Sequence, residues 1–228
     1  LTGFVAVLSR LLTRHGNRVG AVLYGGANPQ AARAVDAVLP PRSSRAHVLH
    51  LVHKLLPPKI PVPLPKTGGG ATELHRLLET GLARVKRRST VVVVSEFSSA
   101  PGWEKPLAQL AQRHDVVAVR LLDPLELELP DVGLVTLRDA ESGEQLQVDT
   151  HDAGFRRRFA QLAADREAAL REGLTRAGAD TLELCTDDDL VDALLRFMDL
   201  RQRRVRAHSN PLSPASASTG AAAQEAAA

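Results

Sequence analysis

Ser89-Thr90-Val91-Val92-Val93-Val94-Ser95-Glu96-Phe97 is the stretch of this sequence that decides the fold. Its four consecutive valines lack polar alternation, which is typical of a strand buried on both faces, as in a parallel sheet covered by helices. In open α/β sheets, ligands bind outside the carboxyl ends of such strands. Ser95 and Glu96 therefore lie where such a fold would place a functional site.

The segments on either side of the valine strand alternate between strand and helix patterns. This alternation predicts an α/β fold, with a Rossmann-like parallel sheet and helices on both faces. Two alternating runs flank Ser142-Gly143 and predict an inserted β-hairpin. The predicted strands are 18–24, 34–39 (a weak signal), 116–122, 134–139, 145–149 and 181–185, and the predicted helices are 1–15, 45–56, 72–88, 103–113, 152–176 and 187–204.

The composition restricts the class of protein. A net charge of +3 is too small to indicate nucleic-acid binding, and the chain has few aromatic side chains on which bases could stack. Cys185 is the only cysteine and is expected to be a small buried side chain in a reducing compartment.

No apolar run is long enough to span a bilayer, so we expect a cytoplasmic location. The expected domain covers 1–204, and the Ala-, Ser- and Pro-rich tail 205–228 is expected to be disordered.

Thr72 and Glu96 are the sharpest candidate site. A glycine-rich loop precedes Thr72, and Glu96 ends the valine strand. A hydroxyl and a carboxylate at the edge of a sheet are ligands that suit Mg²⁺, but two ligands are too few to hold it. The competing interpretation is structural, since Thr72 is a good helix N-cap and Glu96 can simply end a strand.

Three other groups of residues are weaker candidates. The glycine-rich loop lacks both the P-loop and the Rossmann spacing, which disfavours nucleotide binding. His47, His50 and His53 recur every three residues, so neighbouring pairs could share a metal, but their helix also has an ordinary apolar face. The aspartates 187–189 at the start of the last helix are interpreted as capping residues.

Several segments resemble a known family. Residues 18–24, 69–74 and 91–97 resemble successive elements of a von Willebrand factor A-type domain. Residues 122–133, 139–144 and 148–150 make the chain similar to the bacterial family called domain of unknown function 58, over about residues 1–204. The resemblance implies a metal-ion-dependent adhesion site in many members, with an Asp-x-Ser-x-Ser motif, a threonine and an aspartate. Thr72 matches the threonine position, and Glu96 stands where aspartate is usual.

The first strand of that fold, with its Asp-x-Ser-x-Ser motif, is missing from this sequence. The chain opens on the helix that should follow this strand. It is either a fragment or a natural variant that has lost metal binding. Loss of a central strand would leave backbone groups and apolar surface uncovered, which favours the fragment. We therefore expect that Mg²⁺ is not bound by this chain alone.

The resemblance implies a non-enzymatic protein-interaction module. Its expected partner is a MoxR-type AAA ATPase, with which it would act in the assembly or maturation of an unknown client protein. The alternative is a metal-assisted hydrolase or phosphotransfer enzyme that uses Glu96 and Asp123 at neighbouring strand ends.

Overall fold

The computed structural model describes residues 1–24, 35–56, 73–138 and 145–209. The chain forms two compact units, residues 1–190 and 191–228. All of the described strands belong to the first unit, and helix α6 (Leu190–Ser209) begins at its last residue. No helix within the described ranges has both the length and the apolar character needed to cross a bilayer.

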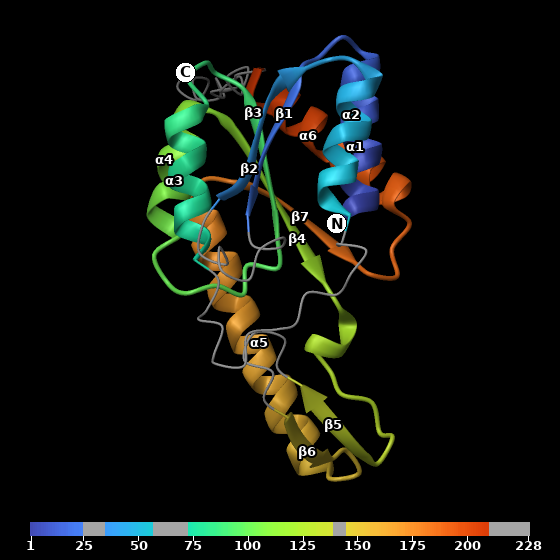
Figure 1. The fold of residues 1–228 in the computed structure, drawn as a ribbon. Helices are drawn as coiled ribbons and strands as arrows, with labels where there is room; N and C mark the ends of the chain where they lie inside the picture. The colour runs from blue at the N-terminus through green and yellow to red at the C-terminus, as the bar shows by residue number, and fades with distance from the viewer. Residues whose placement is uncertain (25–34, 57–72, 139–144, 210–228) are drawn as a thin grey trace, which may run out of the picture. The chain divides into compact units, whose positions relative to one another are not determined.

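A parallel three-stranded sheet is the centre of the first unit. Its strands are β3 (Thr90–Ser95), β4 (Asp115–Leu122) and β7 (Asp180–Cys185), in the order β3-β4-β7 (Figure 1). Both pairings are parallel, and the register aligns Ser95, Arg120 and Glu183 across the three strands. The predicted α/β class with a parallel sheet and flanking helices is confirmed.

The central strand is β4, not the valine strand. Residues 116–120 of β4 are all buried, whereas Val93 is the only buried valine of β3. Among the described strands, β3 pairs with β4 alone. The prediction that β3 is buried on both faces was therefore wrong, because its second edge lacks a hydrogen-bonded neighbour in this part of the chain.

A second, separate sheet contains β1 (Val19–Tyr24) and the antiparallel strand β2 (Val35–Arg42). The strand that was weakly predicted at 34–39 is thus confirmed, and it continues through Pro40 and Pro41. Prolines are tolerated there because β1 is the only described neighbour of β2.

Helices cover the sheets, and a largely aliphatic core lies beneath them. The helices of the first unit are α1 (Thr2–Arg14), α2 (Arg45–Leu55), α3 (Leu74–Arg84), α4 (Glu104–Arg113) and α5 (Ala153–Arg176). α3 packs against α4 and also contacts both β1 and β2. The core under these helices includes Leu74, Leu78, Val93, Phe97, Trp103, Leu107, Leu110, Val116, Ala118 and Leu174.

The predicted β-hairpin is confirmed as β5 (Leu134–Arg138) and β6 (Gln145–Asp149). It forms its own two-stranded sheet and follows the short 3₁₀-helix η1 (Pro124–Glu126). The hairpin lies near the N-terminal end of α5, away from the parallel sheet (Figure 1). Residues 139–144, which contain its predicted turn, lie outside the described residues.

A buried ion pair joins the central strand to α5. The guanidinium of Arg120 donates two hydrogen bonds to the carboxylate of Glu167, with Nη1–Oε2 and Nη2–Oε1 distances of 2.5 Å. The two residues are 5% and 9% exposed. Removing one member of such a pair leaves an uncompensated charge in the interior, whereas apolar replacement of both is often neutral.

We expect Glu167→Gln to lower the free energy of unfolding by about 3 kcal/mol, because Arg120 would then be buried without a counter-charge. The matched control is Glu172→Gln on the same helix. Its partner Arg176 is 72% exposed, so the loss should stay below about 0.5 kcal/mol. Urea denaturation followed by circular dichroism measures both, and equal losses in the two variants would contradict this role of the pair.

Candidate functional site

Glu96 follows the carboxyl end of β3 and lies at the surface, on a turn that is fixed by the contacts of Phe97. Phe97, the next residue, has φ 58°, a left-handed conformation that is uncommon for a bulky side chain. Its amide donates to Ser95 Oγ at 3.0 Å, and its buried ring contacts Trp103 edge-on with 5.5 Å between centroids. These contacts hold Phe97 inward, while Glu96 is exposed.

The loop after β3 also contacts the start of α3. The amide of Leu74, the first residue of α3, donates to Ser99 Oγ at 3.0 Å. Thr72 lies two residues before this helix and outside the described residues. The structure thus brings the loop that contains Glu96 to the helix start that follows Thr72, and the pairing of Thr72 with Glu96 stays a prediction.

Asp123 and Glu126 lie on the same edge as Glu96. The Asp123 carboxylate caps η1 by accepting from the amide of Leu125 at 3.0 Å. Partial burial raises the pKa of Glu126, and the negative charge of Glu96 raises it further, as does that of Asp123. Glu96 and Asp123, the pair named in the enzymatic alternative, are thus each close enough to Glu126 to raise its pKa.

The described acidic residues do not fit a Mg²⁺ site by themselves. Within the described ranges, no three His, Cys, Asp or Glu side chains converge as metal ligands would. Asp123 is already engaged in capping η1. Binding of Mg²⁺ through Thr72 and Glu96, and its expected absence from this chain alone, both remain predictions.

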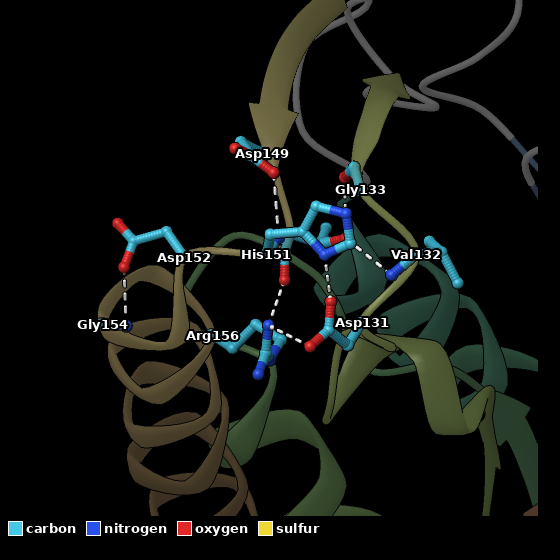
Figure 2. Close-up of polar contacts among 9 residues, drawn as sticks. Asp131, Val132, Gly133, Asp149, His151, Asp152, Gly154 and Arg156 are labelled. Carbon is cyan, nitrogen blue, oxygen red and sulfur yellow. Dashed lines mark hydrogen bonds and ion pairs between the residues drawn. The ribbon is translucent and has the colours of Figure 1, made fainter.

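A second polar cluster lies at the base of the hairpin, and sequence reasoning missed it (Figure 2). His151 Nδ1 donates to Asp131 Oδ1 at 2.5 Å, and Arg156 Nη1 lies 3.2 Å from Asp131 Oδ2. Arg156 also donates to the carbonyl of Thr150. Asp131 and His151 are 20 residues apart and carry no recognisable motif, so only the pairing of β5 with β6 reveals their contact.

Backbone geometry beneath this cluster fixes the base of the hairpin. Thr150 is fully buried, and its Oγ1 donates to the carbonyl of Gly133 at 2.8 Å and accepts from the amide of Val132 at 3.1 Å. Gly133 has φ 86°, and a Cβ there would lie 3.2 Å from His151 Nε2. Glycine is thus required at 133 by both conformation and space. The cluster orients the hairpin relative to the start of α5.

The remaining candidate residues are the cysteine, the aspartates before α6 and the histidines of α2. Burial raises the pKa of the Cys185 thiol, with a further contribution from Asp188, so the nucleophilic thiolate is disfavoured. Asp188 Oδ2 accepts from the amide of Cys185 at 2.9 Å and closes the turn after β7. His47 is buried, whereas His50 and His53 are exposed, and His47 and His50 line one surface pocket.

The fold and the carboxyl-edge residues define an α/β domain with an acidic strand edge and an inserted hairpin. Residues 1–169 match the family described as protein of unknown function DUF58, and the chain belongs to this family. The sequence-based identification of the family is therefore confirmed. The family description assigns no activity.

The relatives are bacterial. An uncharacterized protein of Mycobacterium tuberculosis is 34% identical over 198 residues, which are 87% of this chain and 58% of that protein. The chain therefore spans under two thirds of the length of this relative. A protein of Paracoccus denitrificans, described as lying in the moxR 3' region, is 33% identical over 100 residues, which are 43% of this chain and 94% of that protein.

Solved structures with a related arrangement correct one expectation. The structure of BatB from Bacteroides thetaiotaomicron aligns with TM-score 0.45 and 11% identity over 88% of each chain. An aerotolerance-related membrane protein from Bacteroides fragilis aligns with TM-score 0.47 and 10% identity, over 89% of this chain and 88% of that one. The second of these proteins is described as a membrane protein, and the cytoplasmic location expected from the sequence is withdrawn.

The hydrogen bond from His151, aided by the charge of Arg156, holds the pKa of Asp131 below its ordinary value of 3.8. A lowered pKa in the folded state stabilises the fold above the ordinary value and ceases to do so as pH falls through the lower one. We expect His151→Gln to move the carboxyl titration of Asp131 upward, towards 3.8. NMR of the side-chain carboxyl carbon measures this midpoint.

Asp152 is the internal control for this titration. Backbone amides of Phe155 and Gly154, not His151, are the main causes that lower its pKa. Its midpoint should therefore be the same in the wild type and in His151→Gln. An unchanged Asp131 midpoint, or an equal shift at Asp152, would show that the His151 hydrogen bond does not persist in solution.

Proposed function

We propose that this chain is a non-enzymatic protein-interaction module that acts with a MoxR-type AAA ATPase in the maturation of a client protein. The observation that carries the proposal is the relative from Paracoccus denitrificans, which is described by its position in the moxR 3' region. Genes that are adjacent in bacteria often encode proteins that act together. The client is a second protein that the ATPase and this module would remodel together.

The carboxyl edge of the parallel sheet supports this proposal. Glu96 is an exposed carboxylate on a turn held by the buried Phe97, so it can contact a partner without rearrangement. Among the described residues, no basic side chain forms an ion pair with Glu96, Asp123 or Glu126. An acidic edge whose carboxylates lack a basic partner attracts a basic surface on another protein and increases the association rate.

The enzymatic alternative has one observation in its favour. The raised pKa of Glu126, beside Glu96 and Asp123, is the kind of perturbation that general acids use. Against it, Asp123 is engaged in capping η1. A base that is already committed to a backbone amide has less freedom to accept a proton from a substrate.

The test is binding of the full chain to the MoxR-type ATPase encoded by the same genome. Isothermal titration calorimetry should give a measurable affinity for the wild type, and Glu96→Lys should weaken it by about tenfold because the charge at the edge is reversed. The matched control is Glu172→Lys, an exposed acidic residue of α5 that is 69% accessible. The control should bind like the wild type.

Two outcomes would overturn the proposal. One is the absence of binding by the wild type in the presence of ATP, ADP or neither nucleotide. The other is hydrolysis of a phosphate-ester or carboxyl-ester probe that Glu126→Gln abolishes, which would establish the enzymatic alternative. A loss of binding that is equal in Glu96→Lys and Glu172→Lys would place the interface elsewhere and remove the acidic edge from it.

A further inference from the structure

We propose that the pocket between the end of β2 and the start of α2 is a binding site for a phosphate-type oxyanion. The pocket has a volume of about 380 Å³ and is lined by Leu39, Pro40, Arg42, Ser44, Ala46, His47 and His50. Cavities of this size hold small ligands. This site is independent of the proposed function and uses none of the residues of the carboxyl edge.

The charge of the lining favours an anion over a metal ion. Arg42 is cationic at every physiological pH, His47 and His50 can become cationic, and none of the seven lining residues is acidic. Within the described part of the chain, no carboxylate forms an ion pair with Arg42. A metal ion would be repelled by Arg42 and would find only two imidazole ligands, so the two-histidine metal interpretation is disfavoured here.

His47 is oriented within the pocket by a specific hydrogen bond. It is only 8% exposed, and its Nε2 lies 2.8 Å from the carbonyl of Val19. Since a carbonyl only accepts, Nε2 must carry the hydrogen. Nδ1 is the other ring nitrogen, and no partner for it is found among the described residues. With a hydrogen on it, this nitrogen is a donor that an oxyanion in the pocket can satisfy.

Ser44, the residue that caps the start of α2, adds a hydroxyl donor to the pocket. Ser44 Oγ accepts from the amide of His47 at 3.2 Å, so its hydroxyl hydrogen remains available to another acceptor. α2 has no acidic residue in its first turn, where helices commonly carry one. An oxyanion would therefore meet a guanidinium, a hydroxyl and two imidazoles, all from a segment of nine residues between Arg42 and His50.

Inorganic phosphate is the probe for the test. It is titrated into the full chain at about pH 6.5, where histidines are partly protonated, with sodium chloride at equal ionic strength as the salt control. The ring signals of His47 and His50 should shift and saturate at millimolar phosphate, and that of His53 should not. Arg42→Gln and His50→Gln should weaken binding by at least about tenfold, the usual loss for a hydrogen bond to a charged group.

His53→Gln is the matched control, because His53 is an exposed histidine of the same helix that does not line the pocket. It should bind phosphate like the wild type. Arg42 and His50 are exposed, so their replacement should leave the fold intact, and circular dichroism checks this.

A second arm identifies the source of the phosphate group. Vesicles of phosphatidylcholine with phosphatidylglycerol are compared with vesicles of phosphatidylcholine alone by sedimentation. Binding to the anionic vesicles that Arg42→Gln abolishes would support the site and assign it to lipid headgroups, whereas a response to inorganic phosphate alone would assign it to soluble phosphates. The proposal is overturned if neither probe binds, or if the two pocket variants and His53→Gln behave alike.

Discussion

Arg120 is a cation in the middle of the buried central strand β4, and the rest of the structure depends on how its charge is compensated. Burial of a guanidinium costs several kcal/mol unless a carboxylate and good hydrogen bonds accompany it. Glu167 meets this requirement from α5, with two contacts of 2.5 Å. The position of α5 on the sheet is therefore set by an ion pair as well as by apolar packing.

Both ends of α5 depend on that alignment. Near its start, Arg156 contacts Asp131 and the carbonyl of Thr150, which fixes the base of the hairpin. Near its end, Gly173 lies so close to Trp103 that a Cβ would be 3.2 Å from the indole. Trp103 in turn supports Phe97, the residue that keeps Glu96 outward. One helix thus connects the hairpin to the acidic edge through packed contacts.

The sequence predicts most of the elements, because their signals are local. The helix predicted over 152–176 is α5, and Asp152 caps it by accepting from the amide of Gly154. What sequence reasoning missed depends on tertiary contacts. The degree of burial of β3 depends on whether a strand pairs with its second edge. A run of four valines carries no information about that pairing. Asp131 and His151 meet only through the hairpin register, and Ser99 reaches α3 only because the loop after β3 returns to it.

The net charge of +3 conceals two local imbalances of opposite sign. At the carboxyl edge of the sheet, Glu96, Asp123 and Glu126 form no ion pair among the described residues, and Arg120 is already paired with Glu167. Between β2 and α2, Arg42, His47 and His50 face a pocket with no acidic residue in its lining. Charges of one sign that gather without compensation lower the stability of the folded chain. A ligand or partner of the opposite sign recovers that free energy on binding, so the acidic edge and the basic pocket should select different molecules.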